Sequence, residues 1–210
     1  MSRVRIVSET KRPRRVRDRP QGTRPHPWEG AASPPTALYV GRAIASTVEA
    51  ELKEAANVGV EAMGLLLGDQ FEDAAGKVYS LAAAAVTAPQ QATGTHVRWA
   101  PDAMADLAGE LDAANFDFVI VGFYHSHLRA ACVPSTIDLD NQRRYFASPH
   151  QVSWILDPLG EVAAAYRLEG GRPVRRPVEL LAGGAKDLEA YLIPKRAPVP
   201  AAKRSSYTPR

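Results

Sequence analysis

The stretch FDFVIVGFYHSH, residues 116–127, is the strongest strand signal in the chain. Its β-branched and aromatic residues favour a strand, and it ends in two histidines, His125 and His127. A second stretch, VEAMGLLLG at 60–68, is almost entirely apolar and is bounded by turn-prone residues. We expect it to form a strand that is buried on both faces.

Around these two stretches, the spacing of the apolar residues changes between strand-like and helix-like. Segment 42–58 places Val48, Leu52 and Ala55 on one helical stripe, and Pro101 opens another helix. The further predicted strands are 77–86, 93–99, 151–156 and 162–168, and the further predicted helices are 135–147 and a short one at 178–192. Strands that alternate with helices predict an α/β or α+β fold, with a single mixed β-sheet flanked by helices.

Charge is unevenly distributed along the 210 residues. Residues 1–36 hold nine Lys or Arg and three Asp or Glu, and residues 172–210 hold the same numbers. Residues 37–171 hold eight basic and 17 acidic residues, and they are long enough to form one core. Basic, proline-rich ends bury little apolar surface. We therefore expect a disordered N-terminal tail at 1–36 and a basic C-terminal extension at 172–210, with at most one short helix.

Composition excludes several classes of protein. The single cysteine, Cys132, excludes a disulfide framework, a four-cysteine zinc site and the Pro-Cys-x-x-Cys site of zinc deaminases. No apolar run approaches the roughly 20 residues that a membrane-spanning helix needs, so we expect no membrane partner. No apolar stretch follows the N-terminal arginines, so a secretory signal is not expected and the predicted location is cytoplasmic.

His125 and His127 are candidate metal ligands. Side chains two apart on a strand point to the same face, about 7 Å apart at Cα, so both imidazoles can reach one ion. Asp138 lies in the first turn of the helix that begins at Ser135, and it can supply a third ligand if the loop folds back. Two histidines and one carboxylate leave a fourth tetrahedral position for water, as in catalytic zinc sites. The sequence therefore predicts one Zn²⁺ per chain and metal-assisted hydrolysis of a carbonyl compound.

Glu61 and Ser135 are the candidate catalytic residues. Glu61 begins a buried strand, where an ionisable side chain is costly unless it has a task or a partner. We expect Glu61 to act as the general base that takes a proton from the water and passes it to the leaving amine. The Ser135 hydroxyl can stabilise the oxyanion that develops on the scissile carbonyl.

Together these residues resemble the signature of the JAMM (MPN+, JAB) family of zinc metalloproteases. The family pattern is a glutamate, then H-x-H-P, then S-x-x-D, and it is matched here by Glu61, His125, His127, Ser135 and Asp138. The strand that leads into the histidines and the later WILDP at 154–158 are also similar to the family, so the likeness spans roughly residues 37–170. Leu128 departs from the pattern, because the family usually has a proline there, although that proline is not a ligand.

The resemblance implies a JAMM/MPN-like catalytic domain over 37–171, with a core like that of cytidine deaminases. It also implies a prokaryotic, deubiquitinase-like isopeptidase that cleaves the bond after the C-terminal glycine of a ubiquitin-like protein. E1-like and E2-like proteins of the same operon are implied partners, and 90–97 is the candidate sheet edge beside which a substrate tail lies. Two alternatives stay open: a peptidase that processes the C-terminus of a ubiquitin-like or sulfur-carrier precursor, and a binding scaffold without turnover.

Each site residue also has a purely structural interpretation. Ser135 and Asp138 suit an ordinary helix N-terminus, and Glu61 can pair with a buried cation. The histidines can be hydrogen bonded within a core, but the joint spacing of all five residues favours the metal site. Cys132 can be interpreted as a thiol nucleophile beside His127, yet no motif supplies an oxyanion hole. A loop cysteine that lines the site is the better interpretation.

The remaining basic residues and histidines lie outside this pattern. Lys11–Arg17 can contact phosphates, but the acidic middle carries no recognisable nucleic-acid module, so nucleic acid is not an expected partner. We expect His26, His96 and His150 to be surface or capping residues.

Overall fold

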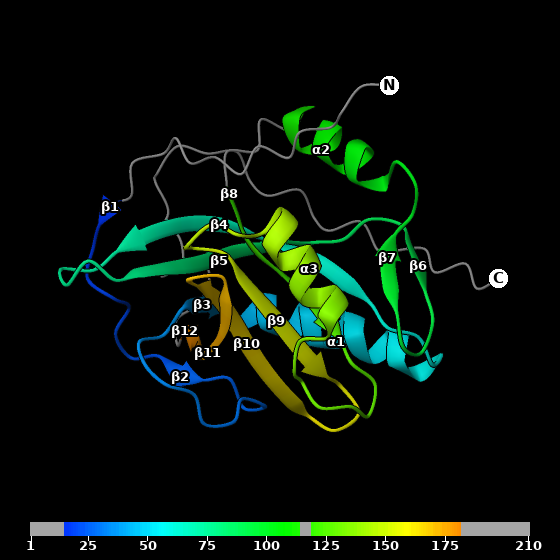
Figure 1. The fold of residues 1–210 in the computed structure, drawn as a ribbon, viewed down its shortest axis with the longest axis horizontal. Helices are drawn as coiled ribbons and strands as arrows, with labels where there is room; N and C mark the ends of the chain where they lie inside the picture. Colours follow the sequence, from blue (N-terminus) through cyan, green and yellow to red (C-terminus); the bar gives the residue numbers. More distant parts are fainter. Residues whose placement is uncertain (1–14, 114–118, 182–210) are drawn as a thin grey trace.

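A ten-stranded mixed β-sheet forms the centre of the computed structural model, which describes residues 15–113 and 119–181 (Figure 1). Its strands are, in chain order, β1 (Arg15–Val16), β2 (Arg24–Pro25), β3 (Leu38–Gly41), β4 (Met63–Glu72), β5 (Val78–Val86), β8 (Val119–Ser126), β9 (Val152–Asp157), β10 (Val162–Glu169), β11 (Arg172–Arg176) and β12 (Val178–Leu181). Nine of them follow the order β11-β10-β9-β8-β4-β5-β3-β12-β2, and β1 pairs with the end of β4. The predicted single mixed sheet flanked by helices is confirmed.

Helices cover both faces of this sheet. Figure 1 shows α1 (Arg42–Asn57) behind the sheet and α3 (Thr136–Tyr145) in front of it. The third helix, α2 (Ala103–Ala113), follows a separate two-stranded hairpin of β6 (Gln90–Ala92) and β7 (Val97–Trp99). All three lie within the segments that the helical spacing predicts. Among the described residues, no helix combines the length and the apolar character that a membrane crossing requires.

Strand β4 is buried on both faces, as its apolar sequence predicts. Leu66 belongs to the core beneath α1 and shares it with Leu52 of that helix. Leu65 and Leu67, which point the opposite way, share a second core with Leu107 of α2. One apolar strand therefore supplies both halves of the interior, and its position in the centre of the sheet follows from that.

Strand β8 lies beside β4 and carries the histidines to one end of the sheet. It pairs antiparallel with β4 and parallel with β9, so His125 lies between Met63 on one side and Ile155 on the other. The C-terminal end of β8 thus meets the beginning of β4. This pairing brings the segment around Glu61 next to the histidines.

Residues 15–36, here called the N-terminal strap, pack against the sheet, whereas the sequence predicts a disordered tail over 1–36. Within the strap, β2 pairs with β12, and the indole of Trp28 is buried in the core beneath α1. The ring of His26 is also buried, and its Nε2 lies 2.8 Å from Glu49 Oε1 of α1. These long-range contacts offset the ordering entropy of a polar segment, and composition alone does not reveal them. Residues 1–14 lie outside the described residues.

The predicted helix over 178–192 is wrong where the structure describes it. Residues Val178–Leu181 form β12, which pairs parallel with β3 and thereby extends the sheet beyond residue 171. The register matches Val178 with Leu38, a partner far away in the sequence. Such pairing overrides local helical spacing in a short segment. Residues 182–192 lie outside the described residues.

Candidate metal centre

His125 and His127 stand at the end of β8 and face the same pocket. His125 is the last but one residue of the strand and is almost completely buried, with its ring stacked on that of Phe123 at 5.7 Å between centroids. His127 lies one residue beyond the strand, and its backbone N–H still donates to the Leu156 carbonyl at 2.9 Å. The alternation that the sequence predicts therefore continues past the end of the strand.

Asp138 reaches the histidines from the first turn of α3. Ser135 is the N-cap of this helix: its Oγ accepts the Asp138 N–H at 3.2 Å, while Asp138 Oδ2 accepts the Ser135 N–H at 2.7 Å. This reciprocal capping box fixes the carboxylate at the helix N-terminus. The capping interpretation of Ser135-x-x-Asp138 is thus confirmed, and the cap holds the Asp138 carboxylate near the two histidines.

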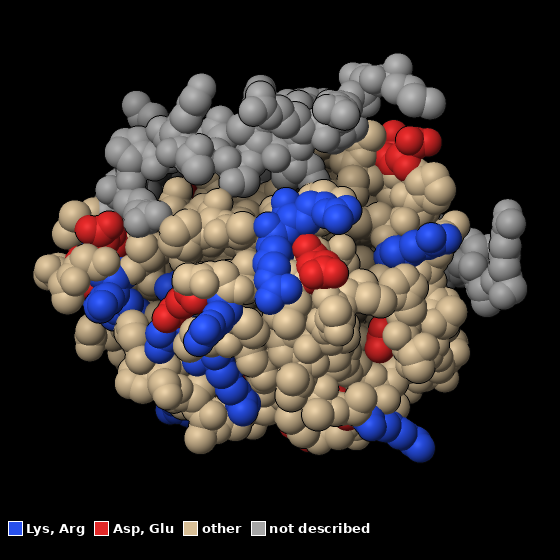
Figure 2. Space-filling model, viewed as in Figure 1, with Lys and Arg blue, Asp and Glu red and all other residues tan. Residues whose placement is uncertain are grey.

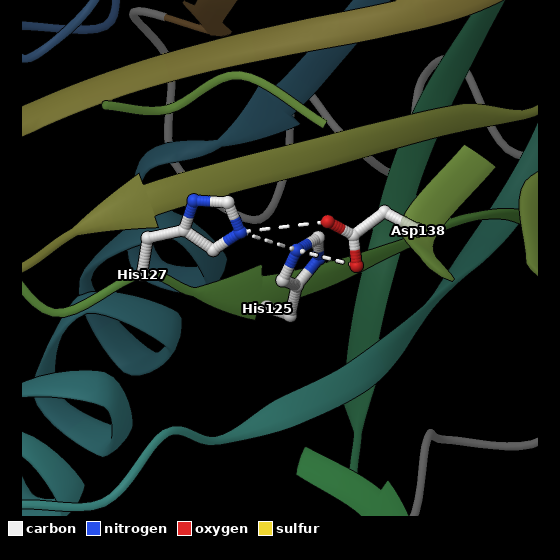
Figure 3. Close-up of side chains that lie close together, drawn as sticks. All are labelled: His125, His127 and Asp138. Atoms are coloured by element: carbon white, nitrogen blue, oxygen red, sulfur yellow. Dashed lines mark hydrogen bonds and ion pairs between the residues drawn. The ribbon is translucent and has the colours of Figure 1, made fainter. Parts of the chain in front are cut away.

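Three donor atoms converge at this point (Figure 3). Asp138 Oδ1 lies 3.3 Å from His125 Nε2, and Asp138 Oδ2 lies 3.5 Å from His127 Nε2. The two Nε2 atoms are themselves 3.3 Å apart, and one ligand atom from each of the three residues lies within 4.8 Å of the others. Two imidazole nitrogens and a carboxylate are ligands that suit Zn²⁺, so the residues present fit this metal.

The second nitrogen of His127 supports this arrangement. His127 Nδ1 lies 2.9 Å from the Ala131 carbonyl, to which only a protonated nitrogen can donate. In the neutral ring, this bond leaves the lone pair on Nε2, which faces Asp138. Metal-binding histidines are commonly oriented by such a backbone partner.

Electrostatics at the site favours opposite charges on the ligands. Burial opposes ionisation of Asp138, but its bonds to His125 and His127 hold the pKa of this carboxyl well below its usual range. Burial likewise opposes the charged form of His127, yet the bonds to Asp138 and to the Ala131 carbonyl raise the pKa of the ring overall. A proton on His127 therefore stabilises the negative charge of Asp138. A bound metal ion would stabilise the same charge.

Glu61 lies just before β4, at the entrance to the strand that pairs with β8. Its side chain is buried, and burial, helped by the negative charge of Asp138, raises the pKa of this carboxyl to about 7; the charge of His127 acts in the opposite direction. A carboxyl group with this pKa can both accept and release a proton near neutral pH. The structure thus brings Glu61 to the pocket of the predicted ligands.

One cavity of about 510 Å³ opens beside these residues. Its walls come from the hairpin, from the loop after β8 and from α3, and its floor is the end of the sheet. Among its lining residues are Glu61, Met63, His96, Val97, Arg98, Trp99, Phe123, His125, His127, Leu128, Ser135, Ile137, Asp138, Tyr145 and Phe146. Apolar side chains line much of it, as is common in ligand-binding pockets.

Some expectations about other residues need correction. Cys132 is buried against Ile155, is not among the residues that line the cavity, and burial raises the pKa of its thiol to about 11. This environment is opposite to that of a nucleophilic cysteine. His26 and His150 are buried, not on the surface, whereas the exposed His96 lines the cavity.

Ser126, between the two histidines, is a residue that sequence reasoning missed. It points away from the histidines, and its Oγ accepts the Ala62 N–H at 2.9 Å, next to Glu61. Its position in the H-x-H pattern could have indicated this role, because the middle residue of the pattern must face the opposite side of the strand. A small hydroxyl there can bond to the adjacent strand.

Comparison with known proteins places this site in context. Residues 40–149 match the family model described as JAB1/Mov34/MPN/PAD-1 ubiquitin protease. The chain is 33% identical over 109 residues to the 26S proteasome regulatory subunit RPN11 of Eremothecium gossypii. It is 31% identical over 109 residues to the ubiquitin carboxyl-terminal hydrolase RPN11 of Saccharomyces cerevisiae. Each alignment covers 51% of this chain and 34% of the relative, so the chain matches only about a third of those proteins.

A solved structure shows a similar fold. The solution structure of a protein from Desulfitobacterium hafniense superposes with a TM-score of 0.50 and 19% sequence identity. The match covers 72% of this chain and 97% of that protein. At this identity the likeness concerns the fold alone.

Proposed function

Because the chain belongs to the JAB1/Mov34/MPN/PAD-1 ubiquitin protease family, we propose that it is a zinc-dependent isopeptidase. Its proposed substrate is the amide or isopeptide bond that follows the C-terminal glycine of a ubiquitin-like protein. The observation that carries the proposal is the convergence of His125, His127 and Asp138, together with Glu61, on one cavity. The ubiquitin hydrolase among the relatives supports the same class of reaction.

His125, His127 and Asp138 would hold the zinc ion through two Nε2 atoms and a carboxylate oxygen. When bound, zinc supplies a Lewis acid that acidifies water and polarises a carbonyl group. The chain contributes rigid placement of these three side chains. β8 holds His125, the Ala131 carbonyl orients His127, and the capping box fixes Asp138.

Glu61 is the proposed general base. Its carboxylate takes a proton from the attacking water and delivers it to the nitrogen of the leaving amine. The pKa of about 7 supports both halves of this transfer, because the group exchanges a proton readily near neutral pH.

Ser135 is the proposed donor to the oxyanion. Its Oγ accepts the Asp138 N–H as a cap, so its own proton remains available for an acceptor in the cavity. A hydroxyl donor at this place would stabilise the charge that develops on the scissile carbonyl oxygen. The serine would thus serve as helix cap and as a hydrogen-bond donor in catalysis.

The direct test is cleavage of two defined substrates by the purified protein. One is ubiquitin joined through an isopeptide bond to a lysine peptide, and the other is a linear ubiquitin fusion with a C-terminal extension. We expect release of the peptide from the isopeptide conjugate, loss of activity after chelation, and recovery after zinc is added back. Glu61→Gln should bind zinc as the wild type does and release no product.

Other results would indicate a different function or a different catalytic base. Cleavage of the linear fusion alone would indicate a peptidase that processes precursors of ubiquitin-like or sulfur-carrier proteins. Binding of ubiquitin with no cleavage of either substrate would indicate a scaffold. Equal activity of the wild type and Glu61→Gln would refute the assigned base.

A further inference from the structure

The backbone of the segment that carries Glu61 is hydrogen bonded on both sides. On one side, the Ala62 N–H donates to Ser126 Oγ at 2.9 Å, and the Ala62 carbonyl accepts the Ser126 N–H at 2.9 Å. On the other side, the Glu61 N–H donates to the carbonyl of Thr93 at 2.8 Å. Thr93 follows β6 in the hairpin, so this segment bridges β8 and the hairpin.

Gln90, at the beginning of β6, completes these bonds at Met63. Its Oε1 accepts the Met63 N–H at 3.0 Å, and its Nε2 donates to the Met63 carbonyl at 2.5 Å. The hydroxyl of Thr87 donates to the same carbonyl at 2.9 Å and accepts from Gln90 Nε2 at 2.5 Å. Both backbone groups of Met63 are thus held by the side chains of Gln90, at the start of the hairpin, and of Thr87, just before it.

This arrangement replaces a missing strand. β4 begins at Met63, but its pairing with β5 starts only at Leu65, within the residues that the structure describes. A neighbouring strand would offer Met63 one acceptor and one donor, and the side-chain amide of Gln90 offers the same pair. Without Gln90, the Met63 N–H would lose this acceptor, and the Met63 carbonyl would keep only the bond from the Thr87 hydroxyl.

We propose that Gln90 is a positioning residue for Glu61, an inference that rests on the proposed function. Gln90 is not among the residues that line the cavity, so it acts through the backbone and not on the substrate. By holding Met63, it fixes the segment two residues from Glu61 to the hairpin whose residues 94–99 line the cavity. One side chain thereby sets the position of the base relative to the wall against which a substrate would lie.

Two variants and one control test the proposal. Gln90→Ala removes both bonds to Met63, and Gln90→Glu keeps the size but places a carboxylate against the Met63 carbonyl. Gln21→Ala is the control, because Gln21 is an exposed glutamine outside the hairpin and the cavity, and its Nε2 donates to the Arg19 carbonyl at 3.2 Å. For each protein we would measure amide hydrogen exchange at Met63 and Glu61, zinc content, and kcat and KM on the isopeptide conjugate.

For both Gln90 variants, we expect exchange at Met63 and Glu61 to accelerate about tenfold or more, while zinc stays at one per chain. We also expect kcat to fall about tenfold with KM within about twofold, because the base is displaced while the cavity remains. Gln21→Ala should keep the wild-type exchange at Met63 and the wild-type kcat.

Faster exchange at Met63 with an unchanged kcat would overturn the proposal, and so would a loss of zinc that parallels the loss of activity. If the wild type cleaves no ubiquitin substrate, the proposed function fails. The role of Gln90 in holding the backbone of Met63 could then still be tested by the exchange rates of the Met63 and Glu61 amides, because that measurement needs no substrate.

Discussion

Asp138 and Ser135 cap the same helix reciprocally: Asp138 Oδ2 accepts the Ser135 N–H at 2.7 Å, and Ser135 Oγ accepts the Asp138 N–H at 3.2 Å. The same carboxylate lies 3.3 Å from His125 Nε2 and 3.5 Å from His127 Nε2. A common helix-start motif therefore orients a candidate metal ligand.

Ser135→Ala should weaken the cap and spare the metal. Loss of the Oγ acceptor leaves the Asp138 N–H without its partner, which costs about 1 kcal/mol of unfolding free energy. The bond from the Ser135 N–H to Asp138 persists, so the carboxylate stays in place and zinc should remain at one per chain. Urea denaturation and elemental analysis measure the two effects. Loss of zinc from Ser135→Ala would show that the hydroxyl is needed to form the metal site.

His127→Ala should abolish stoichiometric zinc binding, because it removes one of the three converging ligands. His96→Ala is the matched control, since His96 also lines the cavity but lies outside the group of ligands. Elemental analysis of both proteins, purified in parallel, should find zinc only in the control. Retention of one zinc per chain by His127→Ala would contradict the assignment of this ligand.

Cleavage should depend on pH through Glu61. A general base works only when deprotonated, so kcat/KM should rise as pH increases through the pKa of Glu61, which burial raises to about 7. A bound cation favours the carboxylate form, so we expect the midpoint of this rise at pH 7 or below. The measurement is kcat/KM on the isopeptide conjugate between about pH 5 and about pH 8. A rate that falls with increasing pH over this range would rule out Glu61 as the base.

Glu29, far from the metal centre in the sequence, should make stability depend on pH. Its carboxyl is buried, accepts from Trp154 Nε1 at 3.2 Å, and burial raises its pKa from 4.5 to about 7, against the opposing effects of Arg175 and Trp154. The folded state therefore binds this proton more tightly than the unfolded state does. Its contribution is fully present below pH 4.5 and is lost as pH rises to about 7.

Glu29→Gln should remove this dependence while keeping an acceptor for the indole. We expect the variant to match the wild type in unfolding free energy near pH 4.5 and to exceed it above pH 7. The difference should be on the order of 2 kcal/mol. Urea denaturation of the metal-free proteins at both pH values measures it. A variant that is destabilised equally at both pH values would show that Glu29 is charged in the folded protein.

The sequence predicts those features that depend on neighbouring residues. The alternation along 116–127 placed both histidines on one face, and Ser135-x-x-Asp138 marked the beginning of α3. The apolar run at 60–68 predicted the central strand. These features follow from local geometry with periods of two or about four residues, which can be recognised in a short stretch.

Features that depend on distant partners were either not predicted from the sequence or predicted incorrectly. Val178–Leu181 forms a strand because β3 offers an edge, and the N-terminal strap packs because the core beneath α1 accepts Trp28. The hydrogen bonds between Gln90 and Met63 join two segments whose sequences do not indicate that they are in contact. In each case the stabilising contacts are made with residues far away in the sequence, so the local pattern of residues does not reveal them.

The sequence by itself determined the type of the candidate site: which side chains are candidate ligands, how they are spaced, and on which elements they stand. Only the tertiary structure decided that these elements meet. Pairing of β4 with β8 brings Glu61 to the histidines, and the loop before α3 returns Asp138 to them. The physical reason is that a periodic pattern fixes the direction of a side chain along its own element, whereas the distance between elements is set by the packing of the whole core.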